Sequence, residues 1–107
     1  MAEHGLILIT CGEPYEARSI ARRLVETRVA AGAQIIPIGS IYRWEGEVVE
    51  GREWILVAKT RRDRFESVRS VVDELHSYEV PPVLMIAIDE ASRPYLAWID
   101  QNVDIPT

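Results

Sequence analysis

The sequence predicts an α+β domain in which an antiparallel sheet carries helices on one face. Apolar runs typical of buried strands lie near both ends of the chain, and two segments space their apolar residues as amphipathic helices do. Between them, Ser40–Thr60 has the pattern of a long hairpin. With 107 residues and no internal repeat, the chain is expected to form one domain over residues 1–107.

The first strand is expected at Leu6–Ile9, a continuous apolar run typical of a central strand buried on both faces. Pro14 then begins a helix, since proline is tolerated in the first turn. Gly32 fits the left-handed position that ends many helices. The helical spacing is carried by Ala17, Ile20, Ala21, Leu24 and Arg28-Val29.

The second strand is expected at Ala33–Ile38, where Pro37 indicates a sheet edge or a kink. The hairpin Ser40–Thr60 follows, and its β-branched and aromatic residues favour strands. Glu45-Gly46 fits a two-residue turn, because glycine readily adopts positive φ. Gly51 is expected to bend the second arm as a bulge.

The length of this hairpin predicts an assembly. Its second arm would span about 40 Å, whereas a domain of this size has a radius of gyration near 13 Å. The hairpin is therefore expected to bend or to protrude and be covered by another subunit.

The remaining elements complete a known pattern. Asp63 and Glu66 resemble a capping box for a second helix that ends around His76 to Tyr78, before Pro81-Pro82. Its apolar positions are Phe65, Val68, Val72 and Leu75. A strand at Val83–Ile88 and a short helix over Ser92–Ile99 follow. The order βαββαβ plus a C-terminal helix is ferredoxin-like.

Composition restricts the partners and the location. The net charge of −5 disfavours nucleic acid, and the basic cluster Arg61, Arg62, Arg64 and Arg69 fits a solvated helix start better than an anion site. The single cysteine excludes an internal disulfide and fits a reducing compartment. Because no apolar run reaches the length of a signal or membrane segment, we expect a cytoplasmic protein without a membrane partner.

Little in the sequence indicates an enzyme. Phosphate loops, nucleophile elbows and HExxH helices are missing from the printed sequence. Cys11 fits a small core residue or, near a helix start, a thiolate ligand for Cu(I) or Zn(II). His76 fits an imidazolium at a helix end or a second ligand. Two ligands leave a zinc site incomplete, so copper(I) or a site shared between subunits stays open.

Several further residues allow two interpretations. The aromatic residues of the hairpin and later helices fit packing or interface positions better than a ligand cage. Glu53 and Lys59 lie on the same predicted arm, where they fit either an ion pair or the lining of a small pocket.

Motifs spread over nearly the whole chain share their order and spacing with a known family. They are Cys11, Ile20-Ala21-x-x-Leu24-Val25-Glu26, Val29-Ala30-Ala31, Ser40-x-Tyr42-x-Trp44-x-Gly46, Glu53, Lys59-Thr60, His76-x-Tyr78-Glu79-Val80-Pro81 and Tyr95-Leu96-x-Trp98. Together these motifs resemble the divalent cation tolerance protein CutA family.

The resemblance implies a ferredoxin-like subunit in a very stable homotrimer, without catalysis and with a role in tolerance of copper or other divalent metals. It implies weak, non-obligatory binding of copper or another transition metal by Cys11 and His76. A second family cysteine is replaced here by Gly32. The resemblance also implies a small-ligand crevice near the subunit interface, formed by Trp44, Glu53, Lys59, Tyr78 and Trp98.

Two other functions stay open. One is a PII-like trimeric signal-transduction module that binds a nucleotide or small anion between subunits, for which Lys59, Arg61 and Arg62 are the evidence. The short hairpin turn leaves no long effector loop for it. The other is an acylphosphatase-like enzyme, which the Gly12-Glu13-Pro14 turn disfavours because it offers an acid and a proline instead of backbone donors.

Overall fold

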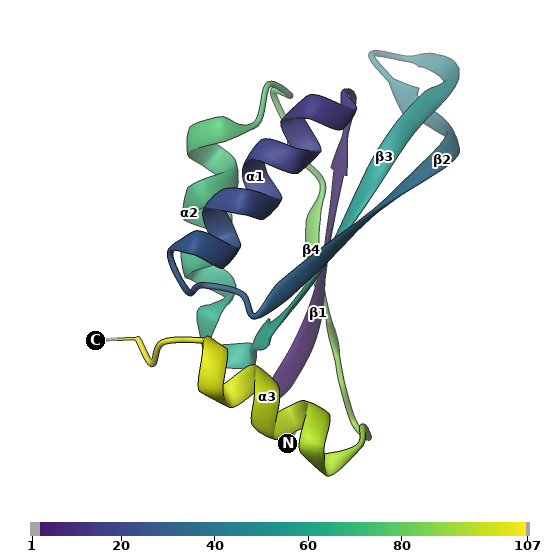
Figure 1. The fold of residues 1–107 in the computed structure, drawn as a ribbon. Coiled ribbons are helices and arrows are strands. Elements are labelled where there is room, and N and C mark those ends of the chain that lie inside the picture. Colours follow the sequence, from purple (N-terminus) through teal and green to yellow (C-terminus); the bar gives the residue numbers. More distant parts are fainter. Residues whose placement is uncertain (1–2, 107) are drawn as a thin grey trace.

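A computed structural model describes residues 3–106 and confirms the ferredoxin-like α+β fold. Figure 1 shows α1 and α2 together on one face of a twisted sheet, with α3 across the end of the sheet near the N-terminus. The elements are β1 (His4–Cys11), α1 (Pro14–Glu26), β2 (Gly32–Trp44), β3 (Glu47–Arg61), the 3-10 turn η1 (Arg62–Arg64), α2 (Phe65–Leu75), β4 (Val83–Ala87) and α3 (Arg93–Asn102).

The sheet has the strand order β2-β3-β1-β4, and every neighbouring pair is antiparallel. β1 is central, as the apolar run Leu6–Ile9 predicted. Its burial nevertheless alternates along the strand, so within a single chain only one of its two faces is fully buried. A strand presents successive side chains to opposite faces, and here the helices cover only one of them.

The core lies between the sheet and helices α1 and α2. Its sheet side comes from alternate residues of β1 and β3, such as Ile7, Ile9 and Leu56, which are fully buried. The helices contribute their apolar stripes at the predicted spacing. The buried helix residues are Ala17, Ile20, Leu24, Val68 and Val72.

The intervening residues of the same strands form what we call the open face. Its exposed apolar residues include Ile36 on β2 and Leu84 and Ile86 on β4. The strand register places these apolar residues on this side: Leu6, Leu8, Ile36, Ile38, Tyr42, Trp44, Val49, Ile55, Val57, Leu84 and Ile86. A face this apolar is typical of an interaction surface.

The hairpin between β2 and β3 turns at Glu45-Gly46, as predicted. Both residues have positive φ, of 49° and 80°, which is the signature of a type I′ turn. Pairing then continues without interruption from Trp44↔Glu47 to Gly32↔Lys59. The predicted bulge at Gly51 is therefore wrong. Uninterrupted pairing gives the molecule its long dimension of 43 Å.

Pro37 lies inside a single continuous β2 and does not separate two segments. It pairs with Trp54 of β3, and β2 has no other neighbour in the sheet. Proline is tolerated at an edge because its missing N–H leaves no inner ladder bond unmade. The predicted edge position is confirmed. No kink divides the strand, because β2 pairs with β3 without interruption through Pro37.

The first helix ends earlier than predicted. α1 stops at Glu26, and Arg28 takes the left-handed conformation expected of Gly32, with a φ of 60°. The guanidinium of Arg28 donates to the Asp104 carboxylate and to the Gln101 carbonyl, both at 2.7 Å. These contacts offset the cost that a side chain pays at positive φ. Gly32 instead begins β2.

The start of the second helix lacks the predicted capping box. Its N-cap is Arg64 and makes no side-chain cap bond. Asp63 binds Arg61 at 2.8 Å, and Glu66 binds Arg69 at 3.0 Å. The carboxylates therefore pair with neighbouring arginines, in agreement with a solvated helix start. The end of α2 at Leu75 agrees with the prediction.

Helix α3 closes the lower end of the sheet. Its residues Ile99 and Leu96 pack with Ala31 in a small second cluster. The aromatic ring of Trp98 lies against Gly32 at the start of β2. Among the helices within residues 3–106, none has the length and apolar character needed to cross a membrane.

Candidate functional site

The two residues predicted as metal ligands lie together at the end of β1 that meets α1. Cys11 ends the strand and faces the helices, while His76 follows directly after α2. Glu16, in the first turn of α1, joins them. One donor atom from each of the three lies within 4.8 Å of the others. The chain thus brings a thiol, a carboxylate and an imidazole to one point.

Hydrogen bonds define the state of the imidazole. The Nδ1 atom of His76 accepts from the amide of Tyr78 at 3.0 Å, and Nε2 lies 2.7 Å from the Thr10 carbonyl. An amide can only donate and a carbonyl can only accept, so the ring is neutral with its proton on Nε2. His76 is thus not the imidazolium helix cap considered above.

The thiol of Cys11 is fully buried. Burial, followed by the negative charges of Glu16 and Glu53, raises its pKa from 9.0 to about 12. At neutral pH this cysteine therefore carries its proton. A thiol of this kind is a poor nucleophile and becomes a metal ligand only when an ion displaces that proton.

These three donors suit a soft or borderline cation by type. Thiolate and imidazole favour copper and zinc, and a carboxylate is a common third ligand. Bonds of about 2.0–2.3 Å require a small closure of the side chains from their present spacing. An ion would replace the proton of Cys11 and the Tyr78 amide at Nδ1 of His76, while Glu16 also receives hydrogen bonds from Ser77.

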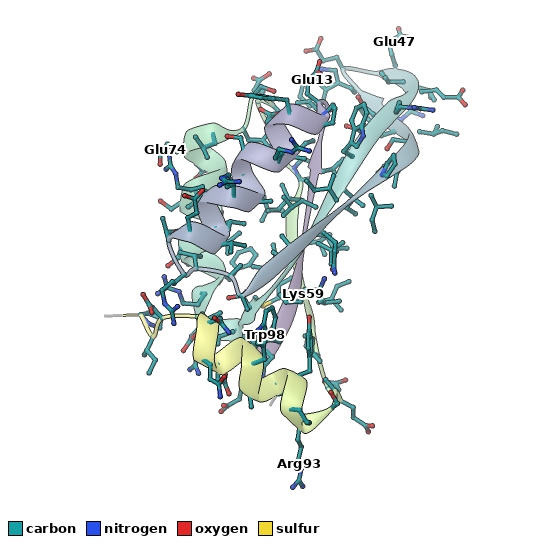
Figure 2. All side chains as sticks on the ribbon, in the orientation of Figure 1. Glu13, Glu47, Lys59, Glu74, Arg93 and Trp98 are labelled. Atoms are coloured by element: carbon teal, nitrogen blue, oxygen red, sulfur yellow. The ribbon has the colours of Figure 1, made fainter. Side chains whose placement is uncertain are left out.

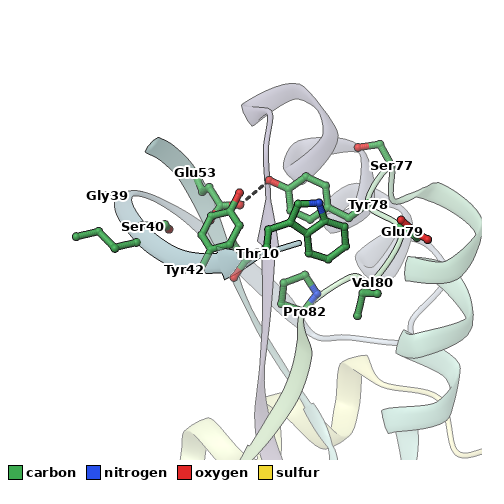
Figure 3. Close-up of a pocket in the computed structure, with 12 residues that line it drawn as sticks. Thr10, Gly39, Ser40, Tyr42, Glu53, Ser77, Tyr78, Glu79, Val80 and Pro82 are labelled. Atoms are coloured by element: carbon green, nitrogen blue, oxygen red, sulfur yellow. Dashed lines mark hydrogen bonds between the residues drawn. The ribbon is translucent and has the colours of Figure 1, made fainter. Parts of the chain in front are cut away.

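A pocket of about 720 Å³ opens on the other side of the same strand end (Figure 3). One wall comes from the hairpin and the other from the segment that links α2 to β4. Its lining residues are Thr10, Gly39, Ser40, Ile41, Tyr42, Trp44, Glu53, Ser77, Tyr78, Glu79, Val80 and Pro82. Volumes of this order are usual for small-molecule sites.

The pocket is organised around a bond between Glu53 and Tyr78. The hydroxyl of Tyr78 donates to Oε2 of Glu53 at 2.5 Å, as the dashed line in Figure 3 shows. Burial and the Glu53 carboxylate together raise the pKa of Tyr78, so this hydroxyl stays a donor. Tyr78 also passes so close to Gly12 that any side chain there would collide with its hydroxyl.

The predicted crevice residues divide into two groups. Trp44, Glu53 and Tyr78 line this pocket. Lys59 and Trp98 lie near the opposite end of the sheet, as Figure 2 shows, where Lys59 pairs with Leu6. Glu53 and Lys59 are six residues apart on one extended strand, so the predicted ion pair between them does not form.

Two residues of the site were not found in the sequence. Glu16 was not predicted to belong to a site, and Tyr42, among the hairpin aromatic residues, was interpreted as a packing or interface residue. Glu16 lies one turn into a helix that directly follows Cys11, and this proximity was the available signal. Tyr42 and Trp44 are two residues apart on the same strand, so both rings lie on one side of the hairpin, where they line the pocket.

Comparisons with known proteins agree with this architecture. Residues 5–102 match a family model described as CutA1 divalent ion tolerance protein. The chain is 44% identical over 98 residues to the divalent-cation tolerance protein CutA of Thermus thermophilus, covering 91% of this chain and 95% of the relative. It is 39% identical over 101 residues to CutA of Archaeoglobus fulgidus, covering 94% and 99%.

Solved structures of the same two relatives share the fold. The Archaeoglobus fulgidus protein, described as periplasmic, has a TM-score of 0.92 at 39% identity over 94% of this chain and 99% of its own. The Thermus thermophilus protein has a TM-score of 0.91 at 42% identity, with the same coverage of 94% and 99%.

Proposed function

Because the chain belongs to the family of CutA1 divalent ion tolerance proteins, we propose that it binds a transition-metal cation and acts in metal tolerance without catalysis. The proposed ligands are Cys11 and His76, with Glu16 as a third. The observation that carries the proposal is the spacing of their donor atoms, all within 4.8 Å of one another. Copper is the preferred ion, since the thiol is the softest donor of the set.

The state of Cys11 makes this binding weak and dependent on pH. A cation must displace the thiol proton, which burial holds with a pKa of about 12. As long as the pH stays below that pKa, each increase of one pH unit therefore raises the metal affinity of the thiolate by about tenfold.

The test is a titration of the purified protein with Cu(I), Cu(II) and Zn(II), followed by calorimetry at two pH values. We expect Cys11→Ser and His76→Ala to weaken binding by at least tenfold, and the wild-type affinity to rise with pH. Glu16→Gln keeps the shape of the side chain and is expected to have a smaller effect.

His4→Ala is the matched control, because His4 binds Asp100 at the other end of the sheet. It should keep the wild-type affinity. If Cys11→Ser and His76→Ala also keep it, the proposed ligands are wrong and the metal binds elsewhere on the surface.

We also propose that the protein is a homotrimer of high stability, that it binds no nucleic acid, and that it is cytoplasmic. The apolar open face and the exposed hairpin support self-association. The single cysteine supports a reducing location. The relative from Archaeoglobus fulgidus is described as periplasmic, so fractionation of the source cell is the decisive measurement.

The PII-like alternative draws no support from the pocket. A nucleotide site needs cations or backbone donors around phosphate. The residues that line the pocket include Glu53 and Glu79 and none that is basic. Arg61, one of the residues behind that alternative, already binds Asp63 and Asp100.

A further inference from the structure

We propose that the pocket between the hairpin and the segment after α2 binds an organic ammonium ion. This site uses Glu53, Tyr42, Trp44 and Tyr78, none of which belongs to the proposed metal centre. The inference therefore stands on different residues from the metal proposal, and either can fail without the other.

The first argument is charge. Glu53 is the only acidic residue buried within residues 3–106, with 7% of its surface exposed. Glu79 adds a second carboxylate to the lining, and no lining residue is basic. A carboxylate removed from water attracts a cation more strongly than one on the surface, because screening is weaker there. The pocket therefore selects a positively charged ligand.

The second argument is the way Glu53 is held. Tyr78 donates to Oε2 and so fixes the orientation of the carboxylate. The other oxygen, Oε1, accepts no hydrogen bond from residues 3–106 and is not a buried unpartnered atom. It is thus open to the pocket and available to a ligand. Tyr78 supplies one donor, which leaves most of the negative charge uncompensated.

The third argument separates organic from inorganic cations. Tyr42, Trp44 and Tyr78 bring three aromatic rings to the pocket, beside the apolar side chains of Ile41 and Val80. In Figure 3 the rings of Tyr42 and Tyr78 lie next to Glu53. Aromatic faces attract ammonium groups and recognise quaternary ammonium ligands. An inorganic divalent ion binds oxygen ligands and gains nothing from aromatic rings and aliphatic side chains, so these parts of the lining favour an organic ammonium ion.

The experiment compares choline with its neutral analogue, in which a quaternary carbon replaces the ammonium nitrogen. The two molecules have the same shape and differ in charge. Binding is followed by calorimetry and by quenching of tryptophan fluorescence. We expect choline to bind at least tenfold more tightly than the analogue. Equal binding of both, or binding of neither, would overturn the proposal.

Two variants and a control locate the site. Glu53→Gln keeps an acceptor for Tyr78 but removes the charge, and we expect at least a tenfold loss of choline affinity. Trp44→Leu should lose affinity about fivefold and abolish most of the quenching. Trp98→Leu is the matched control, since Trp98 and Trp44 are exposed to similar extents, 40% and 42%.

The Trp98→Leu variant should bind choline as the wild type does, within twofold. If it loses affinity as Trp44→Leu does, the ligand is bound elsewhere and the assignment is wrong. Competition with magnesium chloride completes the test. Added salt of any kind weakens charge attraction, so the reference is the concentration of a neutral salt without divalent ions that displaces choline. If magnesium displaces choline at a much lower concentration than this reference, the pocket is an inorganic cation site and the proposal is overturned.

Discussion

The two faces of the sheet are built from the same strands, yet they differ in what covers them. On the face that carries α1 and α2, Ile9 and Leu56 are fully buried. On the open face, Leu84 and Ile86 remain 49% and 47% exposed although they are equally apolar. Apolar character in a strand therefore does not reveal whether helices of the same chain cover that face.

The largest expected effect comes from placing charge on the open face. In Leu84→Lys combined with Ile86→Lys, two ammonium groups would enter the proposed subunit interface, where unpaired charges are costly. We expect the trimer mass in light scattering to fall to that of a folded monomer, with unchanged circular dichroism. Ser70→Lys combined with Gln101→Lys adds the same charge at exposed positions and should stay trimeric. A trimeric mass for both proteins would contradict this use of the open face.

The next effect compares one substitution on each face. In the monomeric double-lysine protein, Leu56→Ala should lower the free energy of unfolding by about 2–5 kcal/mol, as large-to-small core changes do. Leu8→Ala, on the open face, should cost clearly less there. In the trimer the two costs should converge, because the partner subunit would bury Leu8. Urea denaturation measures both, and equal costs in the monomer would disprove the distinction.

The sequence was sufficient for features that depend on local chemistry. Gly46 determined the turn, and the spacing of Val68 and Val72 determined the buried side of α2. Features fixed by distant contacts were missed. Arg28 takes the left-handed position at the end of α1, where the Arg28 and Val29 amides bond to the Val25 and Leu24 carbonyls. Its side chain is held by Asp104, 76 residues further along the chain, and this contact could not be read from the sequence. The alternating burial of β1 could not be predicted either. Leu and Ile occupy both faces of this strand, so its sequence is a continuous apolar run.

The same division between local and distant contacts applies to the candidate site. Cys11 and His76 were identified as a pair, and the fold brings them together with Glu16. The five crevice residues were grouped through the family resemblance. Trp44, Glu53 and Tyr78 line one pocket, whereas Lys59 and Trp98 lie near the other end of the sheet. The separation of Glu53 from Lys59 follows from strand geometry alone, since six residues of one extended strand span about 20 Å. Because both residues were predicted on one arm, the sequence already contained this information.

A third prediction tests burial on the covered face through pH. Burial raises the pKa of Cys11 from 9.0 to about 12, so its contribution to stability is complete below pH 9.0. Above that value the unfolded thiol ionises while the folded one keeps its proton. The stability of the wild type should therefore fall relative to Cys11→Ala by about 1.4 kcal/mol per pH unit. Urea denaturation at about pH 8 and pH 10.5 should show a difference of about 2 kcal/mol. A constant difference would mean that the thiol is not protected.

The smallest expected effect belongs to Lys59, the single lysine of the chain, which lies on the open face beside Leu6. Partial burial lowers the pKa of its ammonium group below 10.5, so the charged form is disfavoured in the folded state. Lys59→Met should therefore increase the free energy of unfolding at neutral pH. That advantage should shrink as the pH rises toward 10.5, because the folded wild type then releases the proton.

The change of stability with pH has the opposite sign to that for Cys11, so the Lys59 effect is measured in a Cys11→Ala background. An advantage that stays constant with pH would show that Lys59 is fully solvated and that the open face is polar at this end.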